Sequence, residues 1–478
     1  MNGSKGLARD AVASIARHLA TIIAGFITVP IIVRMLGASR LGFWSLLGTA
    51  AFLLGLCDLG LNTATLRAAA GSDTSYAKQV ARLAALMTTV LAVPAVAACV
   101  WWLFEASRQL PVDQRSDART AVLIGLAGGV VGAASQSARS YAQGQGRIVA
   151  LAWARAGAVA LQLVVTVSLL LAGLGLSAVA LGFASGALVE AILGFRAARD
   201  GVRAQGLLPR GDNRRELVRI AGSAMLTNLS VIFAVRADVL VLERITNLAT
   251  IGAYSVAARL VDQGFTLVKQ VSAALVPRLG KRAKNRGSSI RLGTMIIGIM
   301  AAGPLAAVAM SGRPILILWA GEPVDLPILG VALTWLSLAA MAAAVYEIPL
   351  SAITLGGDAW AAARFIALGS ITNVTLSIVG GYAFGPWAVA ASTFAGNLVL
   401  ALLTWRSSIR TLRWDAQTVA LTFLPILVSI PVAAVTAWAC DRASLNGILS
   451  TAAGCLAAIS VGAVLVFRLR PSASEVLA

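Results

Sequence analysis

The sequence predicts an all-α polytopic membrane protein with about 14 transmembrane helices. Two six-helix bundles related by a pseudo-two-fold axis along the membrane normal would be followed by two additional C-terminal helices. Three observations predict this fold. Of the 478 residues, 58% are hydrophobic and only 12% are charged, whereas a soluble chain carries about 25% charged residues. Apolar runs of about 20 residues recur along the whole chain, and its two halves resemble each other at a constant offset.

The apolar runs give the helices in order, because about 20 apolar residues cross the hydrocarbon core of a bilayer once. No cleavable signal peptide is expected, since the first run extends to a full span. A count of twelve spans remains the alternative. The predicted spans are Val12–Leu36, Leu41–Leu66, Val80–Leu103, Ala121–Tyr141, Ile148–Leu174, Ser177–Phe195, Leu217–Leu242, Ile251–Val276, Leu292–Trp319, Leu326–Leu355, Ala361–Phe384, Trp387–Trp405, Val419–Cys440 and Leu445–Phe467.

The positive charge of the chain indicates a membrane orientation rather than nucleic-acid binding. The formal net charge is +19, but most Lys and Arg lie in short loops between apolar runs, without an aromatic–basic nucleic-acid motif. With a cytoplasmic N-terminus, roughly 26 of the 39 Lys and Arg fall on the cytoplasmic side and about eight outside. We therefore expect a multi-pass protein of the bacterial inner (cytoplasmic) membrane with both termini in the cytoplasm.

An internal repeat divides the chain. At an offset of about 210 positions, Gly42 corresponds to Gly252 and Gly186 to Gly396. Two units of equal topology would enclose a central cavity and rock about it in alternating access. The predicted parts are an N-terminal six-helix bundle (1–197), a cytoplasmic linker (198–216), a C-terminal six-helix bundle (217–410) and two additional transmembrane helices (411–478).

Motifs for metal or nucleotide chemistry are missing from the sequence. The four cysteines lie in apolar runs without metal-ligand spacing, so we expect packing roles for Cys57, Cys99, Cys440 and Cys455. No Gly-rich phosphate loop of the Walker type occurs, which excludes a primary ATP-driven pump. We expect no cofactor and no metal site, and transport would draw on an ion gradient, the membrane potential or a substrate gradient.

Ionisable residues inside the predicted spans are the candidate site. Each Arg, Lys or Asp at mid-bilayer costs about 3 kcal/mol, so five cations facing lipid would oppose folding by about 15 kcal/mol, comparable to a domain's stability of about 5–15 kcal/mol. Such charges must line a hydrated cavity or pair with one another. The same holds for Arg155 and Glu190 in the fifth and sixth spans. We predict a cationic substrate-binding cavity formed by Arg17, His18, Arg236, Arg259 and Lys269.

Arginine suits an anionic headgroup such as a diphosphate, because its planar guanidinium binds two phosphate oxygens and stays charged. The alternative interpretation is structural: the charges pair to fix helix register, Arg17 and Lys269 extend to the inner interface, and His18 is a packing residue. Arg259, Asp262 and Lys269 have the spacing of one helical face, so Arg259 and Asp262 can pair.

The carboxylates within the spans also have two interpretations, coupling to protons or sodium ions and compensation of neighbouring arginines. They are Asp58, Asp238, Asp262 and Glu347. Compensation is favoured for Asp262, and both interpretations stay open for the other three.

Two longer stretches resemble a known family. RADVLVLERITNLATIGAYSVAARLVDQ is similar to the start of the second half in polysaccharide flippases (O-antigen and exopolysaccharide repeat-unit type) of the multidrug/oligosaccharidyl-lipid/polysaccharide exporter (MOP) superfamily. In these proteins an Asp near the end of the seventh helix precedes a short turn and a Gly-x-Tyr, here Asp238, Gly252 and Tyr254. The first half has the matching RMLGASRLGFWSLLGTAAFLLGLCDLGLNTATLRAAAG, and the resemblance covers about residues 10–410.

The resemblance implies a flippase that moves an undecaprenyl-diphosphate-linked oligosaccharide from the cytoplasmic to the periplasmic leaflet for surface polysaccharide biosynthesis. Its partners would be that glycan lipid, membrane lipids and polysaccharide polymerase machinery, without nucleic acid. One alternative is a cation-coupled multidrug antiporter of the same superfamily, which would need an acidic and aromatic cavity. Another is a membrane enzyme of glycan assembly. The short loops, without a paired-carboxylate or nucleotide-sugar motif, favour a protein that is not an enzyme.

Overall fold

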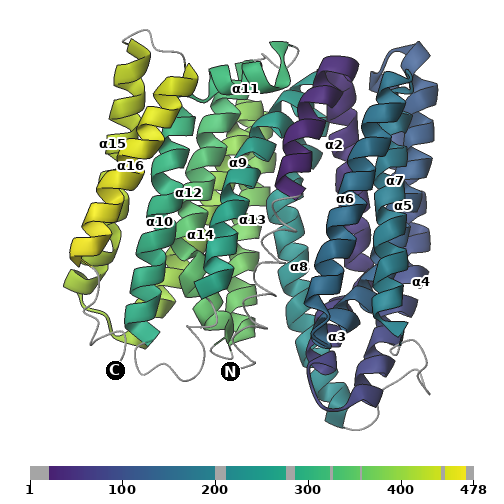
Figure 1. Ribbon diagram of the computed structural model, residues 1–478, viewed down its shortest axis with the longest axis horizontal. Coiled ribbons are helices and arrows are strands. Elements are labelled where there is room, and N and C mark those ends of the chain that lie inside the picture. Colours follow the sequence, from purple (N-terminus) through teal and green to yellow (C-terminus); the bar gives the residue numbers. More distant parts are fainter. Residues whose placement is uncertain are drawn as a thin grey trace. The chain divides into compact units, whose positions relative to one another are not determined.

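The computed structural model describes residues 21–199, 212–275, 286–322, 327–355, 358–442 and 447–469. Within these ranges the regular elements are all helices, as Figure 1 shows. Twelve helices of the described residues are long and apolar enough to cross a membrane. The all-α polytopic membrane fold predicted from the apolar runs is confirmed.

The chain forms two compact units. Unit 1 comprises Met1–Ile232 and Asn247–Gly252, and unit 2 comprises Phe233–Thr246 and Ala253–Ala478. Helices α8 (Asp212–Ile245) and α9 (Leu248–Leu275) contribute residues to both units. Most of the predicted linker 198–216 lies outside the described residues, and the four-part division of the chain stays a prediction.

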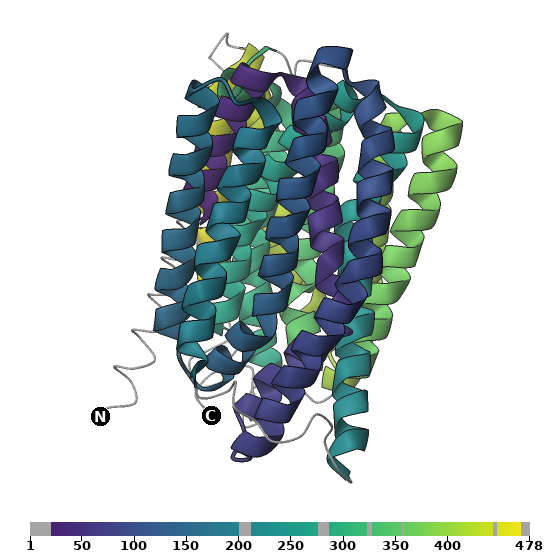
Figure 2. The same ribbon diagram turned by 90° about the vertical axis from the view of Figure 1, so that its right-hand side faces the viewer.

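Glycines set the packing of the long helices of unit 1, which Figure 2 shows running lengthwise beside one another. Helix α7 packs along both α5 and α6, and a Cβ at Gly182 of α7 would lie only 1.9 Å from the Thr166 hydroxyl oxygen of α6. Unit 1 contains the helical segment Thr21–Leu36 and then α2 (Ala38–Leu53), η1 (Leu54–Asp58), α3 (Leu61–Ala69), α4 (Thr74–Ala106), η2 (Ser107–Gln109), α5 (Val112–Gly144), α6 (Ile148–Leu171) and α7 (Gly175–Ala197).

In unit 2, helix α14 packs along α12 and α13, and α10 packs along α12, α15 and α16. A Cβ at Gly396 of α14 would lie 2.6 Å from the Gly369 carbonyl oxygen of α13, and its repeat equivalent Gly186 approaches Ala158 of α6 in the same way. The further helices are α10 (Arg286–Ser311), α11 (Arg313–Ala320), α12 (Pro327–Leu355), α13 (Ala359–Phe384), α14 (Pro386–Leu412), α15 (Ala416–Arg442) and α16 (Gly447–Leu469).

Each predicted span has a helical counterpart, but two of these counterparts are not among the twelve helices that are long and apolar enough to cross a membrane. Helix α9 is 28 residues long and carries Arg259, Asp262 and Lys269, and it does not qualify by composition. The first predicted span is described only over Thr21–Leu36, which is shorter than a full span. Its residues 12–20 lie outside the described part of the chain.

The predicted span Leu41–Leu66 is wrong as one continuous helix. Leu59 and Gly60 have φ angles of 52° and 78°, and left-handed residues end a right-handed helix. The Asp58 carboxylate accepts hydrogen bonds from the backbone N–H groups of Gly60 and Asn62, each at 3.0 Å. These contacts fix the turn between η1 and α3.

The predicted span Leu292–Trp319 is also interrupted. Helix α10 ends at Ser311, and α11 begins after Gly312 with a proline in its first turn, Pro314. Proline lacks the backbone N–H that would continue the hydrogen-bond ladder of a preceding helix, whereas it is well suited to the start of a new one. A continuous apolar run therefore contains two helices.

Within unit 1, α2 and the first turn of α9 cross at two glycines that the repeat relates. A Cβ at Gly42 would lie 1.9 Å from the carbonyl oxygen of Leu248, and a Cβ at Gly252 would lie 2.1 Å from that of Ala38. Ala38 and Leu248 are related by the same offset as the glycines. The two close contacts are therefore reciprocal at the offset of the sequence repeat.

Candidate functional site

The predicted cations of the second half lie on α8 and α9. On α9, Asp262 and Lys269 are exposed and Arg259 is half-buried, whereas Val261 and Phe265 beside them are buried. The Lys269 ammonium lies 5.0 Å from the centroid of the Phe265 ring. Exposed charges within a span are costly in hydrocarbon, so this face of α9 is suited to a hydrated surface.

Electrostatic interactions link this face to α8 and α12. The Asp262 carboxylate interacts with the charges of Arg236, Lys269 and Arg259, and Glu347 of α12 interacts with Lys269. Neither carboxylate forms an ion pair within the described residues. Arg259 and Asp262 thus interact over a longer distance than the direct pair that their spacing allows.

Asp238 of α8 is buried among neutral hydrogen-bond donors. Its Oδ2 atom accepts hydrogen bonds from the Tyr254 hydroxyl of α9 and, at 2.6 Å, from the Thr393 hydroxyl of α14. The Ser377 hydroxyl of α13 lies 3.4 Å from Oδ1. In the part of the chain that is described, no arginine forms an ion pair with Asp238. Hydroxyl groups from three helices therefore satisfy this carboxylate.

Amide and hydroxyl groups extend the surroundings of Asp238. The Asn373 side-chain oxygen accepts a hydrogen bond from Ser392 at 3.0 Å, and its amide nitrogen donates to the Ala234 carbonyl oxygen at 3.1 Å. Asn373 and Ser392 are both buried. A carboxylate surrounded by oxygen atoms can bind a proton or a small hard cation.

Asp58, the predicted carboxylate of the first half, has a structural environment. Its carboxylate is buried and both oxygens accept backbone N–H groups at the turn before α3. A turn with two otherwise unsatisfied N–H groups is stabilised by such an acceptor. Asp58 thus stabilises the turn between η1 and α3.

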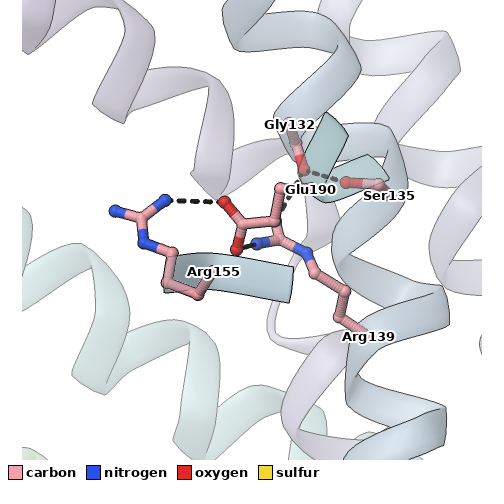
Figure 3. Close-up of polar contacts among 5 residues, drawn as sticks. All are labelled: Gly132, Ser135, Arg139, Arg155 and Glu190. Atoms are coloured by element: carbon pink, nitrogen blue, oxygen red, sulfur yellow. Dashed lines mark hydrogen bonds and ion pairs between the residues drawn. The ribbon is translucent and has the colours of Figure 1, made fainter. Parts of the chain in front are cut away.

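A further charged cluster lies in unit 1, shown in Figure 3. Glu190 of α7 bridges two arginines: its Oε1 accepts from Arg139 of α5, and its Oε2 accepts from Nη1 of Arg155 of α6 at 2.6 Å. Arg139 also donates from Nη2 to the Gly132 carbonyl oxygen at 2.9 Å. We call Arg139, Arg155 and Glu190 the triad.

Two of the predicted cations, Arg17 and His18, lie outside the described residues. Conversely, some residues around these sites gave little signal in the sequence. Sequence reasoning did not single out Arg139, Asn373 or Thr393. Arg139 lies near the end of its predicted span. Hydroxyl and amide side chains are frequent in membrane helices, so they give only a weak signal in one sequence.

The sequence profile of polysaccharide biosynthesis proteins matches residues 7–282, more than half of the chain. The chain belongs to the polysaccharide biosynthesis protein family. Its fold is similar to that of the lipid II flippase MurJ in an inward closed conformation, with a TM-score of 0.73 at 11% sequence identity, covering 96% of this chain and 99% of that chain. No curated protein sequence matches the chain.

MATE transporters of known structure also share the fold. An inward-facing multidrug resistance MATE transporter of the MOP superfamily gives a TM-score of 0.64 at 15% identity, covering 84% of this chain and 98% of that chain. A mutant of the Vibrio cholerae MATE transporter VcmN gives 0.55 at 16% identity, covering 87% and 98%. The family match confirms that the chain belongs with polysaccharide biosynthesis proteins, and the solved structures that share its fold are a flippase and transporters.

Proposed function

We propose that this member of the polysaccharide biosynthesis protein family is a flippase for undecaprenyl-diphosphate-linked oligosaccharide. It moves the glycan headgroup from the cytoplasmic to the periplasmic leaflet by alternating access, while the polyprenyl tail stays in lipid. The protein resides in the bacterial inner membrane with both termini in the cytoplasm, and it supplies the polymerase machinery of surface polysaccharide biosynthesis. No chemical step on the substrate is needed.

The observation that carries this proposal is the accessible charged face of α9. Arg259 makes no hydrogen bond or ion pair within the described residues, and Lys269 is exposed. Together with Arg236 of α8 they place three cationic groups near the carboxylates of Asp262 and Glu347. Guanidinium groups bind the oxygens of a diphosphate with directed, charge-assisted hydrogen bonds.

Asp238 supports a second part of the proposal, which is the coupling of transport to an ion. Its buried carboxylate is held by hydroxyl groups of α9, α13 and α14. Binding of a proton or sodium ion would neutralise a charge that joins these helices. Neutralisation of a buried charge changes the relative stability of two conformations whenever the site differs between them.

The proposal can be tested in proteoliposomes that contain a fluorescent undecaprenyl-diphosphate glycan, with the leaflet read by a membrane-impermeant quencher. Wild-type protein should transfer the label between leaflets. Arg259→Ala and Arg236→Ala should each lower the rate by about ten- to hundredfold, the range expected for loss of a hydrogen bond to a charged group. Arg244→Ala is the matched control, because Arg244 is an exposed arginine of α8 paired with Glu243 at 3.3 Å.

The same vesicles separate the proposal from its nearest alternative. A multidrug antiporter would accumulate cationic dyes, for which three positive charges on α8 and α9 are unfavourable. Export of dyes without glycan flipping would contradict the proposed substrate. Full flipping by both arginine variants would contradict the site assignment while leaving the flippase activity in place.

A further inference from the structure

The triad of unit 1 contains more positive charge than its structure requires. Glu190 and Arg139 alone form a neutral pair, and Arg139 is anchored further by its hydrogen bond to Gly132. Arg155 adds a second guanidinium to the same carboxylate. In the described residues neither arginine pairs with another acid. The triad therefore carries a net charge of about +1 within the predicted membrane spans, where an uncompensated arginine is costly.

The two arginines differ in what remains available to a ligand. The Arg139 side chain is 20% exposed, and two of its nitrogen atoms donate to protein oxygens. The Arg155 side chain is 41% exposed and donates from Nη1 alone. Figure 3 shows the rest of the Arg155 guanidinium directed away from Glu190. Its Nε and Nη2 atoms thus keep N–H donors for another acceptor.

The Arg155 side chain does not project from the exposed apolar face of α6. On α6 that face is marked by Trp153, Val164 and Leu171. With 3.6 residues per turn, Arg155 lies about 160–180° around the helix from these three residues. Its side chain begins on the face that packs against α7. Accessibility on this side indicates contact with water or a polar ligand instead of lipid tails.

We propose that Arg155 forms an oxyanion-binding subsite in unit 1, held in place by Glu190 and Arg139, for a phosphate or carboxylate group of the lipid-linked glycan. This subsite rests on the proposed flippase function and adds a residue that the α8–α9 charges do not include. Nε and Nη2 donate to the oxyanion, whose charge compensates the excess of the triad. Glu190 and Arg139 are positioning residues, because they fix the guanidinium without contacting the ligand.

Binding to the full-length protein in nanodiscs tests the subsite. The probes are undecaprenyl diphosphate, an undecaprenyl-diphosphate glycan that carries a uronic acid, and undecaprenol, which has no anionic group. Arg155→Gln should weaken binding of an anionic probe by about ten- to hundredfold and leave undecaprenol binding unchanged. Arg155→Lys should retain part of the affinity, because it keeps the charge and loses the planar fork.

A matched control and a stability measurement separate binding from folding. Arg108→Gln removes an exposed arginine of the same unit that pairs with Glu105 at 2.9 Å, and it should bind every probe like the wild type. Equal weakening of both anionic probes by Arg155→Gln assigns the subsite to phosphate. Weakening of the uronic acid probe alone assigns it to a sugar carboxylate.

Two binding results would overturn the subsite, and one flipping result would do the same. One is an affinity of Arg155→Gln for both anionic probes within about twofold of the wild type. The other is a lowered unfolding midpoint with unchanged affinity of the folded protein, which would make Arg155 purely structural. A flipping rate of Arg155→Gln equal to that of the wild type would exclude the subsite and leave the flippase function in place. If the wild type binds the anionic probes but does not flip them, the flippase function is excluded and the subsite is retained.

Discussion

Substitution of Gly42 by alanine perturbs the crossing of α2 and α9. The new Cβ would lie 1.9 Å from the Leu248 carbonyl oxygen, whereas ordinary contact begins at 3.4 Å. The two helices must therefore separate by about 1.5 Å, the difference between these two distances, because backbone cannot turn aside as a flexible side chain can. Overpacking of this kind costs about 1–3 kcal/mol. We expect a lower unfolding midpoint for Gly42→Ala.

Thermal unfolding of the purified protein in detergent measures this effect, and Gly48→Ala is the matched control. Gly48 lies on the same helix, and a Cβ added there would have no neighbouring atom within 4 Å, so alanine at this position should stabilise the helix by up to about 1 kcal/mol. Gly42→Ala combined with Gly252→Ala should cost less than the sum of the single losses, because one separation relieves both clashes. An unfolding midpoint for Gly42→Ala equal to that of Gly48→Ala would refute the close crossing.

Two further predictions concern carboxylates. Asp238→Asn keeps the shape of the side chain and removes its charge, so flipping in proteoliposomes should lose its response to imposed sodium or proton gradients; a retained response would exclude Asp238 as the coupling group. Asp117→Ala removes the acceptor of the Leu176 and Ser177 backbone N–H groups, at 2.6 Å and 3.0 Å, at the start of α7, and should cost about 1–2 kcal/mol in thermal unfolding. Asp113→Ala, which removes no such cap in the described residues, should cost less, and equal losses would contradict the capping role.

Much of the fold was predictable because hydrophobicity is a property of consecutive residues. Apolar runs located the spans, and the repeat related Gly42 to Gly252, which the structure then places at one helix crossing. The interruption at Leu59 and Gly60 was missed, since the residues around it are as apolar as those of a continuous span. The left-handed backbone there depends on the Asp58 carboxylate, whose contacts a hydropathy pattern does not contain.

The candidate site was predictable in its residue types and only partly in its partners. Ionisable residues stand out in an apolar sequence, so Arg259, Asp262 and Lys269 could be found without a structure. Whether they form direct ion pairs could not be predicted, because their spacing along one helix allows a direct contact that the side-chain conformations do not make. Arg17 and His18 lie outside the described residues, and their role stays a prediction.

Sequence alone determined that this chain enters a membrane, where its helices lie, which family it resembles and which charges need an explanation. Tertiary structure decided how those charges are satisfied. Glu190 meets arginines 51 and 35 positions away, and Asp238 meets hydroxyl groups 139 and 155 positions away. The physical reason is that a charge in a low-dielectric interior is stabilised by whichever groups the packing of other helices brings to it, and such neighbours are set by helix faces rather than by order along the chain.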